Sequence, residues 1–255
     1  MDLSAFDLKG KVALITGGAH GIGFSIAEGM AKCGATICFN CSSEASLEKG
    51  MAAYKAAGID AHGYAADVSD EDAVNAMVAK IKAEVGPVDI LVNNAGLIRR
   101  EDALAFSEKD WDDVMNLNIK SVFFMSQAAA KHFIAQGSGG KIINIASMLS
   151  FQGGIRVPSY TASKSAVMGV TRLLANEWAK HNINVNAIAP GYMATNNTQQ
   201  LRADEQRSSE ILDRIPAGRW GLPADLMGPV VFLASPASDY INGYTVAVDG
   251  GWLAR

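Results

Sequence analysis

The sequence predicts an α/β protein in which a parallel sheet lies between helices. Apolar runs of strand length alternate with longer segments whose apolar residues recur at helical spacing. The first run, residues 11–16, leads directly into a glycine-rich turn and then into a helical segment that reaches about Lys32. Single hydrophobic cores remain workable up to roughly 250–300 residues, so 255 residues are enough for one large domain and few for two. We therefore expect a single domain over residues 1–255.

Composition and charge narrow the class of protein. Hydrophobic residues make up 49% of the chain and charged residues 19%, with 25 glycines, which fits a globular sheet protein with many tight turns. The formal net charge of −4 argues against a nucleic acid partner. No apolar run reaches the ~18 residues of a membrane span, and the N-terminus lacks the basic start and long apolar run of a signal peptide. We expect a cytoplasmic protein that binds neither nucleic acid nor membranes.

The cysteines and histidines do not form a pattern typical of a metal or redox site. Cys33, Cys38 and Cys41 make neither an even disulfide set nor a two-pair zinc pattern. The spacing of Cys38 and Cys41 is that of a redox motif, but Cys38 lies inside an apolar run, which favours a structural role. The four histidines are scattered along the chain. We therefore predict no metal.

The glycine-rich turn after residues 11–16 is typical of a dinucleotide-binding fold. Glycines let the backbone approach a pyrophosphate, and the start of the next helix offers unpaired N–H groups and a positive dipole end to it. A histidine within the turn is placed near an adenosine phosphate. The predicted contacts in this turn are Gly17, His20, Gly21, Ile22 and Gly23.

The end of the second apolar run, residues 35–40, decides which nicotinamide dinucleotide is preferred. An acidic residue there would hydrogen-bond the ribose hydroxyls and repel a 2′-phosphate. This chain has Cys41 and Ser42 instead, and its next carboxylate is Glu44. The arginine or lysine that usually accompanies a 2′-phosphate is also missing. The sequence therefore favours NADP(H), but NAD(H) stays open.

Tyr160 and Lys164 are the centre of the predicted chemistry. Pro158 gives a helix start, and apolar residues follow it at helical spacing, so the tyrosine and the lysine lie one turn apart. An ammonium one turn away favours the phenolate, and moving its pKa from ~10 to about 7 or 8 takes roughly 3 to 4 kcal/mol. Taken alone, the motif also fits a tyrosine and a lysine on the solvated face of a helix.

Ser147 and Asn118 favour a catalytic role for Tyr160 and Lys164 over a solvated helix face. Ser147 follows the buried run 140–146, at the edge of a parallel sheet where ligands bind, and so meets Tyr160 across the intervening loop. With Asn118, these residues resemble the Asn-Ser-Tyr-Lys tetrad of the short-chain dehydrogenase/reductase family. The glycine turn also has that family's spacing, Thr-Gly-x-x-x-Gly-x-Gly. The resemblance runs over essentially the whole chain.

The resemblance implies a single-domain Rossmann fold, with a doubly wound, seven-stranded parallel sheet and helices on both faces. It also implies a homotetramer in which the last strand and its helix pack against a neighbouring subunit. In this family an Asp-Val pair contacts adenine, an Asn-Asn-Ala-Gly turn borders the cofactor, and a Pro-Gly turn with a nearby threonine flanks the nicotinamide. The matching positions here are Asp67, Val68, Asn94, Ala95, Gly96, Pro190, Gly191 and Thr195. A helix N-cap is the alternative role for Asp67, although Asp70 is better placed for it.

The tetrad implies a reversible hydride transfer with nicotinamide as cofactor. Tyr160 exchanges the proton with the substrate oxygen, and Ser147 holds that oxygen. Lys164 lowers the tyrosine pKa and binds the nicotinamide ribose, while Asn118 holds a water that links Lys164 to solvent. A nucleotide-binding scaffold without catalysis is the distant alternative. It is disfavoured because degenerate relatives usually lose the tyrosine or the lysine.

Two parts of the chain resemble different members of the family. Residues 97–255 resemble bacterial enzymes of uronate breakdown that act at C5 of a 3-deoxy keto sugar acid, whereas the first third resembles enzymes that act at C5 of gluconate. The two parts join near residues 93–96. Because substrate contacts come mostly from the second part, we expect the 3-deoxy sugar acid as substrate, with gluconate as the alternative. The predicted substrate contacts are Arg100, Met148, Gln152, Arg156 and Tyr192.

Arginines and a polar segment border the predicted substrate site. Arg99, Arg100 and Arg156 fit ordinary solvated loops, yet at the mouth of the crevice one arginine would hold a carboxylate bidentately. Residues 196–216 are polar and charged, with helical stretches and no long apolar run. We predict a mobile lid over the substrate there, and an ordinary solvated helix is the alternative.

Overall fold

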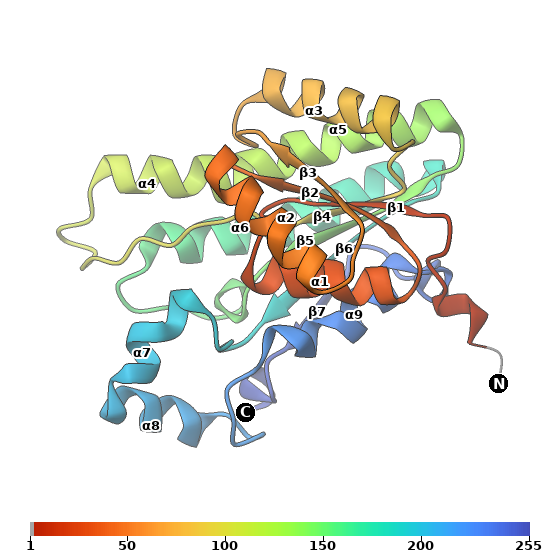
Figure 1. Ribbon diagram of the computed structural model, residues 1–255. Coiled ribbons are helices and arrows are strands. Elements are labelled where there is room, and N and C mark those ends of the chain that lie inside the picture. Colours follow the sequence, from red (N-terminus) through yellow and green to blue (C-terminus); the bar gives the residue numbers. More distant parts are fainter. Residues whose placement is uncertain (1–2) are drawn as a thin grey trace.

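Seven parallel strands form one sheet in residues 3–255, the part of the chain that this computed structural model describes (Figure 1). The strands are β1 Val12–Ile15, β2 Thr36–Cys41, β3 Ala61–Ala65, β4 Ile90–Asn93, β5 Gly140–Ile145, β6 Ile183–Pro190 and β7 Thr245–Val248. Their order is β3-β2-β1-β4-β5-β6-β7, so the winding reverses between β1 and β4. The predicted doubly wound sheet is confirmed. Met1 and Asp2 lie outside the described residues, and with them the start of the stretch compared above with a signal peptide.

The strands are buried because helices cover both faces of the sheet. Every residue of β1 and β4 is buried, as are the last five residues of β2. A parallel sheet covered on both faces requires such continuous apolar runs, which is why the sequence revealed them. One boundary differs from the expectation: Cys41 ends β2 instead of following it.

Most helices lie in two layers against the sheet, and two further helices lie outside these layers. They are α1 Gly21–Lys32, α2 Glu44–Ala56, α3 Glu71–Glu84, α4 Glu108–Met115, α5 Ser121–Gln136, α6 Pro158–Trp178, α7 Gln199–Ala203, α8 Glu205–Arg214 and α9 Met227–Ala234. In Figure 1, α3 and α5 lie above the sheet, and α1 and α9 lie below it. Side chains of α1, α2 and α9 form one hydrophobic cluster with the sheet, and those of α3, α5 and α6 form another. The predicted arrangement of helices on both faces is confirmed.

Local capping explains where the helices near the site begin. The carboxylate of Asp70 accepts hydrogen bonds from two backbone N–H groups in the first turn of α3. Asp67 accepts hydrogen bonds from the backbone N–H and the hydroxyl of Ser69, so Asp70 is the cap, as expected. Pro158 occupies the first turn of α6, where its missing N–H leaves no partner unsatisfied.

Residues 196–216 form a helical arm at the lower left of Figure 1. A short 3-10 turn, Asn196–Thr198, precedes α7 and α8, which agrees with the expected polar helical stretches. Ile211 and Ile215 of this arm are buried in a small hydrophobic cluster with Met148 and Trp252. This cluster joins the arm to the rest of the molecule, and the mobility of the arm stays a prediction.

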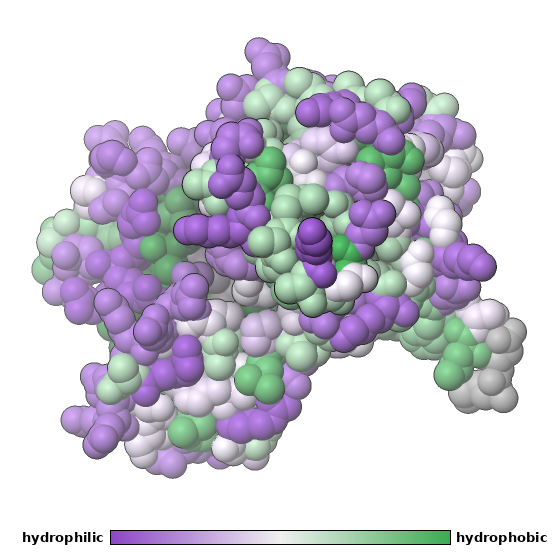
Figure 2. All heavy atoms as spheres, in the orientation of Figure 1, coloured by the Kyte–Doolittle hydropathy of each residue, from purple (hydrophilic) through white to green (hydrophobic). Residues whose placement is uncertain are grey.

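The surface, the helices and the cysteines bear on the class of protein that the composition indicated. Hydrophilic residues are spread over the face seen in Figure 2, and hydrophobic residues form small separate groups on it. Within residues 3–255, no helix is long and apolar enough to cross a membrane. The same part of the chain holds no cluster of three His, Cys, Asp or Glu side chains that would bind a metal. Burial, with a smaller effect of Glu84, raises the pKa of the Cys38 thiol to about 12, which suits a structural role.

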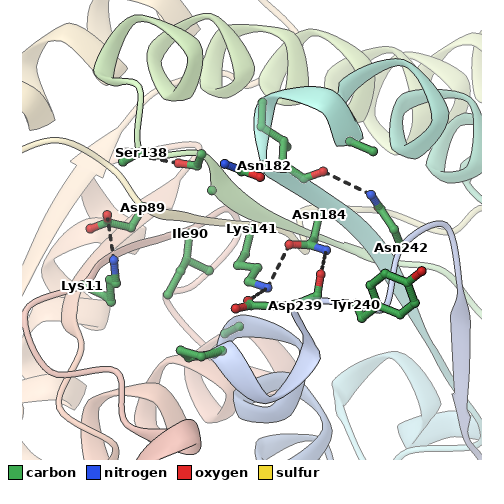
Figure 3. Close-up of a pocket in the computed structure, with 16 residues that line it drawn as sticks. Lys11, Asp89, Ile90, Ser138, Lys141, Asn182, Asn184, Asp239, Tyr240 and Asn242 are labelled. Atoms are coloured by element: carbon green, nitrogen blue, oxygen red, sulfur yellow. Dashed lines mark hydrogen bonds and ion pairs between the residues drawn. The ribbon is translucent and has the colours of Figure 1, made fainter.

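A polar hollow of about 680 Å³ lies at the amino ends of the central strands (Figure 3). Lys141, at the start of β5, donates hydrogen bonds to Asn184 at 2.9 Å and to Asp239 at 2.7 Å. Lys11 pairs with Asp89 at 3.5 Å. Both lysines therefore have a carboxylate partner inside the hollow. The contacts of Lys141 join the starts of β5 and β6 to the segment before β7.

One ion pair supports the connection between α8 and α9 and gives a test of the fold. Arg219 donates two hydrogen bonds to Asp225, at 2.7 and 2.9 Å, and the backbone N–H of Leu222 donates a third at 2.7 Å. The Arg219 bonds, followed by the Leu222 N–H, lower the pKa of Asp225 to about 2. The folded pKa lies below the unfolded value of about 3.9, so this stabilisation is complete above that value and is lost as pH falls through 2.

We expect Asp225→Asn to lower the melting temperature slightly at pH 7, because solvent screens the exposed pair and limits its contribution to stability. The difference from the native chain should shrink as pH falls from 4 to 2. Thermal unfolding at several pH values measures it, with Asp60→Asn at an exposed position as the control. An equal effect of both substitutions at every pH would contradict the assignment.

Candidate active site

The glycine turn between β1 and α1 forms an open cradle at the carboxyl end of the sheet. α1 begins at Gly21, and the preceding His20 is extended and makes no side-chain hydrogen bond to the helix start. Such a start presents N–H groups and a positive dipole end to an anion. A Cβ atom on Gly23 would collide with the carbonyl oxygen of Gly17, so only glycine permits this close packing of turn and helix.

Thr16 and Asn94 join this turn to the end of β4. The side-chain amide of Asn94 donates to the carbonyl oxygens of Thr16 and Gly17, both at 3.0 Å. Thr16 Oγ1 accepts hydrogen bonds from the backbone N–H groups of Asn94 and Ala95, also at 3.0 Å. The Asn-Asn-Ala-Gly turn thus lies beside the glycine turn where the strand order reverses, which is the ligand-binding point of open parallel sheets.

A cleft of about 470 Å³ extends from the glycine turn to Tyr160 and Lys164. Its glycine-lined end at a helix N-terminus suits the pyrophosphate of a dinucleotide. The predicted cofactor contacts that line it are Gly17, His20, Gly21, Ile22, Gly23, Cys41, Ser42, Asp67, Val68, Asn94, Ala95, Gly96, Tyr160, Lys164 and Thr195. The two remaining ones, Pro190 and Gly191, line an adjoining cavity.

The end of the cleft beside β2 has no carboxylate at the strand end, where an acid would select NAD. Cys41, Ser42 and Ser46 line it there, together with His20. Asp67 is the one carboxylate among the described residues that line the cleft, and Ser69 hydrogen-bonds it. The cleft therefore offers no acidic residue at the end of β2 to repel a 2′-phosphate.

Ser147, Tyr160 and Lys164 meet where the cleft joins the second cavity. Ser147 follows β5, and a side-chain hydrogen bond joins it to Tyr160 on α6. Lys164 lies one turn further along α6, with its Nζ 5.7 Å from the centre of the Tyr160 ring. The same Nζ donates a hydrogen bond to the carbonyl oxygen of Ile145 at 2.6 Å. The fold thus brings together three residues that the sequence had placed in one reaction centre.

Asn118 lies behind this group and is fully buried. It belongs to a π-helical turn, Asn116–Lys120, an irregularity that is frequent at functional sites. Its Oδ1 accepts a hydrogen bond from the Leu97 N–H, and its Nδ2 donates to the Leu97 carbonyl, both at 2.9 Å. Nδ2 also donates to Ser163 Oγ at 3.2 Å. The side chain fastens the segment after β4 to α6, and its role in holding a water for Lys164 stays a prediction.

Burial sets the proton affinities of the tyrosine and the lysine. Burial raises the pKa of Tyr160, while the hydrogen bond with Ser147 and the charge of Arg100 act in the opposite direction. Burial also lowers the pKa of Lys164 to about 8. Burial therefore disfavours the charged form of each residue, the phenolate of Tyr160 and the ammonium of Lys164. In the chain by itself burial raises the pKa of Tyr160, and the contribution of Lys164 to lowering it stays a prediction.

A cavity of about 770 Å³ opens on the other side of Ser147 and Tyr160. The predicted substrate contacts all line it: Arg100, Met148, Gln152, Arg156 and Tyr192. Arg214 and Trp252 also line it, and the sequence did not reveal them. The Arg214 guanidinium lies 4.0 Å from the centre of the Trp252 ring, which packs edge-on against Tyr192. Neither residue belongs to a local motif, because Arg214 comes to the cavity from the arm and Trp252 from the turn after β7.

The arginines predicted to bind a carboxylate differ in their partners. Arg100 Nη2 donates a hydrogen bond to the backbone carbonyl of Asn197 at 3.1 Å. Arg156 forms two ion pairs, with Glu101 at 3.3 Å and with Asp102 at 3.1 Å. Within residues 3–255, no carboxylate pairs with Arg100. Two carboxylates thus already pair with the Arg156 guanidinium, and its binding of a substrate carboxylate stays a prediction.

Known proteins resemble this chain over its full length. The sequence profile of the family described as short chain dehydrogenase matches residues 11–206. The 2-dehydro-3-deoxy-D-gluconate 5-dehydrogenase of Escherichia coli (strain K12) is 73% identical over 100% of both chains. The gluconate 5-dehydrogenase of Gluconobacter oxydans (strain 621H) is 44% identical over 96% of both chains. The crystal structure of a gluconate 5-dehydrogenase from Burkholderia cenocepacia J2315 with NADP and tartrate matches with a TM-score of 0.95 and 41% identity, over 99% of both chains.

These similarities have a clear consequence for classification. The matches to the relatives continue through the first third of the chain, so the proposed join near residues 93–96 stays a prediction. The family profile spans most of the chain, from the first strand to the helical arm. Because both the profile and the end-to-end identities agree, the chain belongs to the short-chain dehydrogenase/reductase family.

Proposed function

We propose that this oxidoreductase transfers a hydride between a nicotinamide dinucleotide and C5 of an acidic sugar derivative. The proposed pair is 2-dehydro-3-deoxy-D-gluconate and 3-deoxy-D-glycero-2,5-hexodiulosonate, compounds of uronate breakdown. The observation that carries this proposal is the identity of 73% to an enzyme named for that substrate, compared with 44% to a gluconate 5-dehydrogenase. Gluconate and 5-ketogluconate are the alternative pair.

In this proposal the cleft binds the dinucleotide and the cavity binds the sugar acid, and Tyr160 lines both. A bound nicotinamide supplies the hydride to C5 of the ketone, or accepts it from C5 of the alcohol. During reduction, Tyr160 Oη donates a proton to the C5 oxygen, and Ser147 Oγ donates a hydrogen bond to the same oxygen. During oxidation, Tyr160 takes that proton back from the C5 hydroxyl. The raised pKa of Tyr160 keeps its phenol protonated at neutral pH, which suits the reduction.

Removing the phenol tests the assignment of Tyr160. We expect Tyr160→Phe to lower kcat roughly 10²-fold or more, because a positioned acid–base group contributes that much. Dinucleotide affinity should stay near that of the native chain, because the aromatic ring is retained. Steady-state kinetics and a dinucleotide titration measure the two effects, with the fully exposed Tyr240→Phe as the control. Turnover close to the native value would remove Tyr160 from its role.

We infer that NADP(H) is preferred over NAD(H). The support is the neutral end of the cleft, where Cys41 occupies the position at which an acid would repel a 2′-phosphate. A second support is the relative from Burkholderia cenocepacia, which was solved with NADP. Both supports concern the ribose end of the cofactor and are independent of the substrate.

Introducing a carboxylate at Cys41 tests this preference. We expect Cys41→Asp to shift the ratio of kcat/KM values towards NAD(H), by about 1 to 3 kcal/mol for a charge-assisted contact. Cys41→Asn, with a similar shape and no charge, is the matched control and should shift it much less. A native protein that already strongly prefers NAD(H) would contradict the inference.

We propose that Arg100 holds the carboxylate of the substrate. It lines the cavity, its charge acts on Tyr160, and its described partner is a backbone carbonyl. A carboxylate bound there leaves the rest of the sugar chain to Met148, Gln152 and Tyr192. Met148 is buried and apolar, which suits the carbon without a hydroxyl in a 3-deoxy acid better than a hydroxyl that would lose its hydrogen bonds.

A comparison of the two substrate pairs tests this assignment. We expect a greater kcat/KM for the 3-deoxy pair than for the gluconate pair. Arg100→Gln should raise KM for acidic substrates about tenfold, as expected when a charged hydrogen bond is lost. Arg99→Gln, which removes a neighbouring arginine paired with Asp110, should leave KM unchanged. A preference for gluconate would mean that the first third of the chain, and not the second part, reports the specificity.

We also propose a cytoplasmic homotetramer with a substrate lid at residues 196–216. β7 is an edge strand that is only partly buried, and the neighbouring Tyr244 is exposed, which leaves a surface that a second subunit would cover. Leu201 and Arg214 of the arm line the cavity, as a lid requires. The three free cysteines fit a reducing compartment.

A further inference from the structure

We propose that Arg156 positions the wall of the substrate cavity and does not bind the carboxylate of the substrate. Arg156, Glu101 and Asp102 form a group that we call the Arg156 clasp. It joins the loop after β4 to the loop before α6. The kinetic part of this proposal rests on the proposed function, whereas the structural part can be tested without any substrate.

The clasp uses both the side chain and the backbone of Arg156. Its Nη2 lies 3.3 Å from Glu101 Oε1, and its Nε lies 3.1 Å from Asp102 Oδ1. Its carbonyl oxygen accepts a hydrogen bond from the Glu101 N–H at 3.1 Å. Glu101 Oε1 also accepts a hydrogen bond from the Asp102 N–H at 2.8 Å, which orients the two carboxylates. The arginine is therefore held by three contacts with one short stretch of the neighbouring loop.

The backbone conformation of Arg156 supports the same reading. Its φ of 63° lies in the left-handed region, which side chains other than asparagine and aspartate rarely adopt. Gly153 and Gly154 stand nearby, yet the positive φ falls on the arginine. A disfavoured conformation persists where the surroundings over-determine it. The contacts of the clasp provide that constraint.

The clasp acts on the loop that carries Arg100. Leu97, at one end of this loop, is fastened by the side chain of Asn118. Glu101 and Asp102, on the other side of Arg100, are fastened by Arg156. Arg100 lies between the two fastenings and lines the cavity. Loss of the clasp therefore loosens the loop on the C-terminal side of Arg100, at Glu101 and Asp102.

The two roles of Arg156 predict opposite effects when its carboxylate partners are neutralised. As a substrate ligand, Arg156 would be released from competition, so the double substitution Glu101→Gln with Asp102→Asn would lower KM for acidic substrates. As part of the clasp, the same double substitution would raise KM. The pairs are exposed, so we expect an increase of about fivefold from both together, with little change in kcat.

A double-mutant cycle distinguishes the two roles kinetically. If Arg156 acts through the clasp, Arg156→Gln raises KM to the same extent as the double substitution. The triple variant then has the same KM as either, since both changes remove the same contacts. Arg156→Lys keeps the positive charge, so its KM should lie between those of the native chain and Arg156→Gln. Lys109→Gln removes a comparable exposed pair on α4 and should leave KM unchanged. A lower KM after the double substitution would overturn the proposal.

Hydrogen exchange tests the clasp without turnover. We expect faster amide exchange in residues 97–107 and 151–157 of Arg156→Gln and of the double variant, with the Glu101 amide most affected. Arg156→Gly relieves the positive φ but loses the ion pairs, so it should show the same faster exchange and an unreduced melting temperature. Unchanged exchange in both loops would overturn the clasp. Absence of turnover in the native chain together with faster exchange would instead refute the proposed substrate alone.

Discussion

The hydrogen bonds between Thr16 and Asn94 are the constraint on which the rest of the site depends. They tie the glycine turn to the end of β4 at the point where the sheet reverses its winding. A parallel sheet opens there because neighbouring strands continue to opposite sides. Without this tie the two turns that border the cleft would be independent loops. With it, the glycine turn and the Asn-Asn-Ala-Gly turn form one connected edge of the cleft.

Desolvation governs the chemistry at the other end of the cleft. Tyr160 and Lys164 lie side by side, yet burial pushes both towards their neutral forms. Lys164 finds compensation in the carbonyl oxygen of Ile145, which accepts a hydrogen bond whether the amine is charged or neutral. Burial of Tyr160 therefore favours its protonated phenol.

The features that the sequence predicted are those encoded within short segments. The strands were recognisable because burial on both faces demands continuous apolar runs, and the glycine turn and the Tyr160 helix carry their spacing locally. Features that depend on distant partners were not predictable. Glu101, one of the two carboxylates that hold Arg156, stands 55 residues before it, and Trp252 reaches the cavity from the last turn. The directions in which burial shifts the pKa values of Tyr160 and Lys164 are likewise not visible in the spacing of these residues.

The small cluster under the helical arm has an evolutionary consequence. Among the described residues it shares no buried side chain with the two large clusters of the sheet, so the arm can change sequence while the sheet keeps its stability. Met148 limits this freedom, because it belongs to the cluster and directly follows Ser147 in the chain. A lineage that acquires a new arm must still accommodate a side chain anchored beside the serine. A change in the arm that displaces Met148 therefore also disturbs the segment that carries Ser147, whereas one that keeps this contact leaves the serine in place.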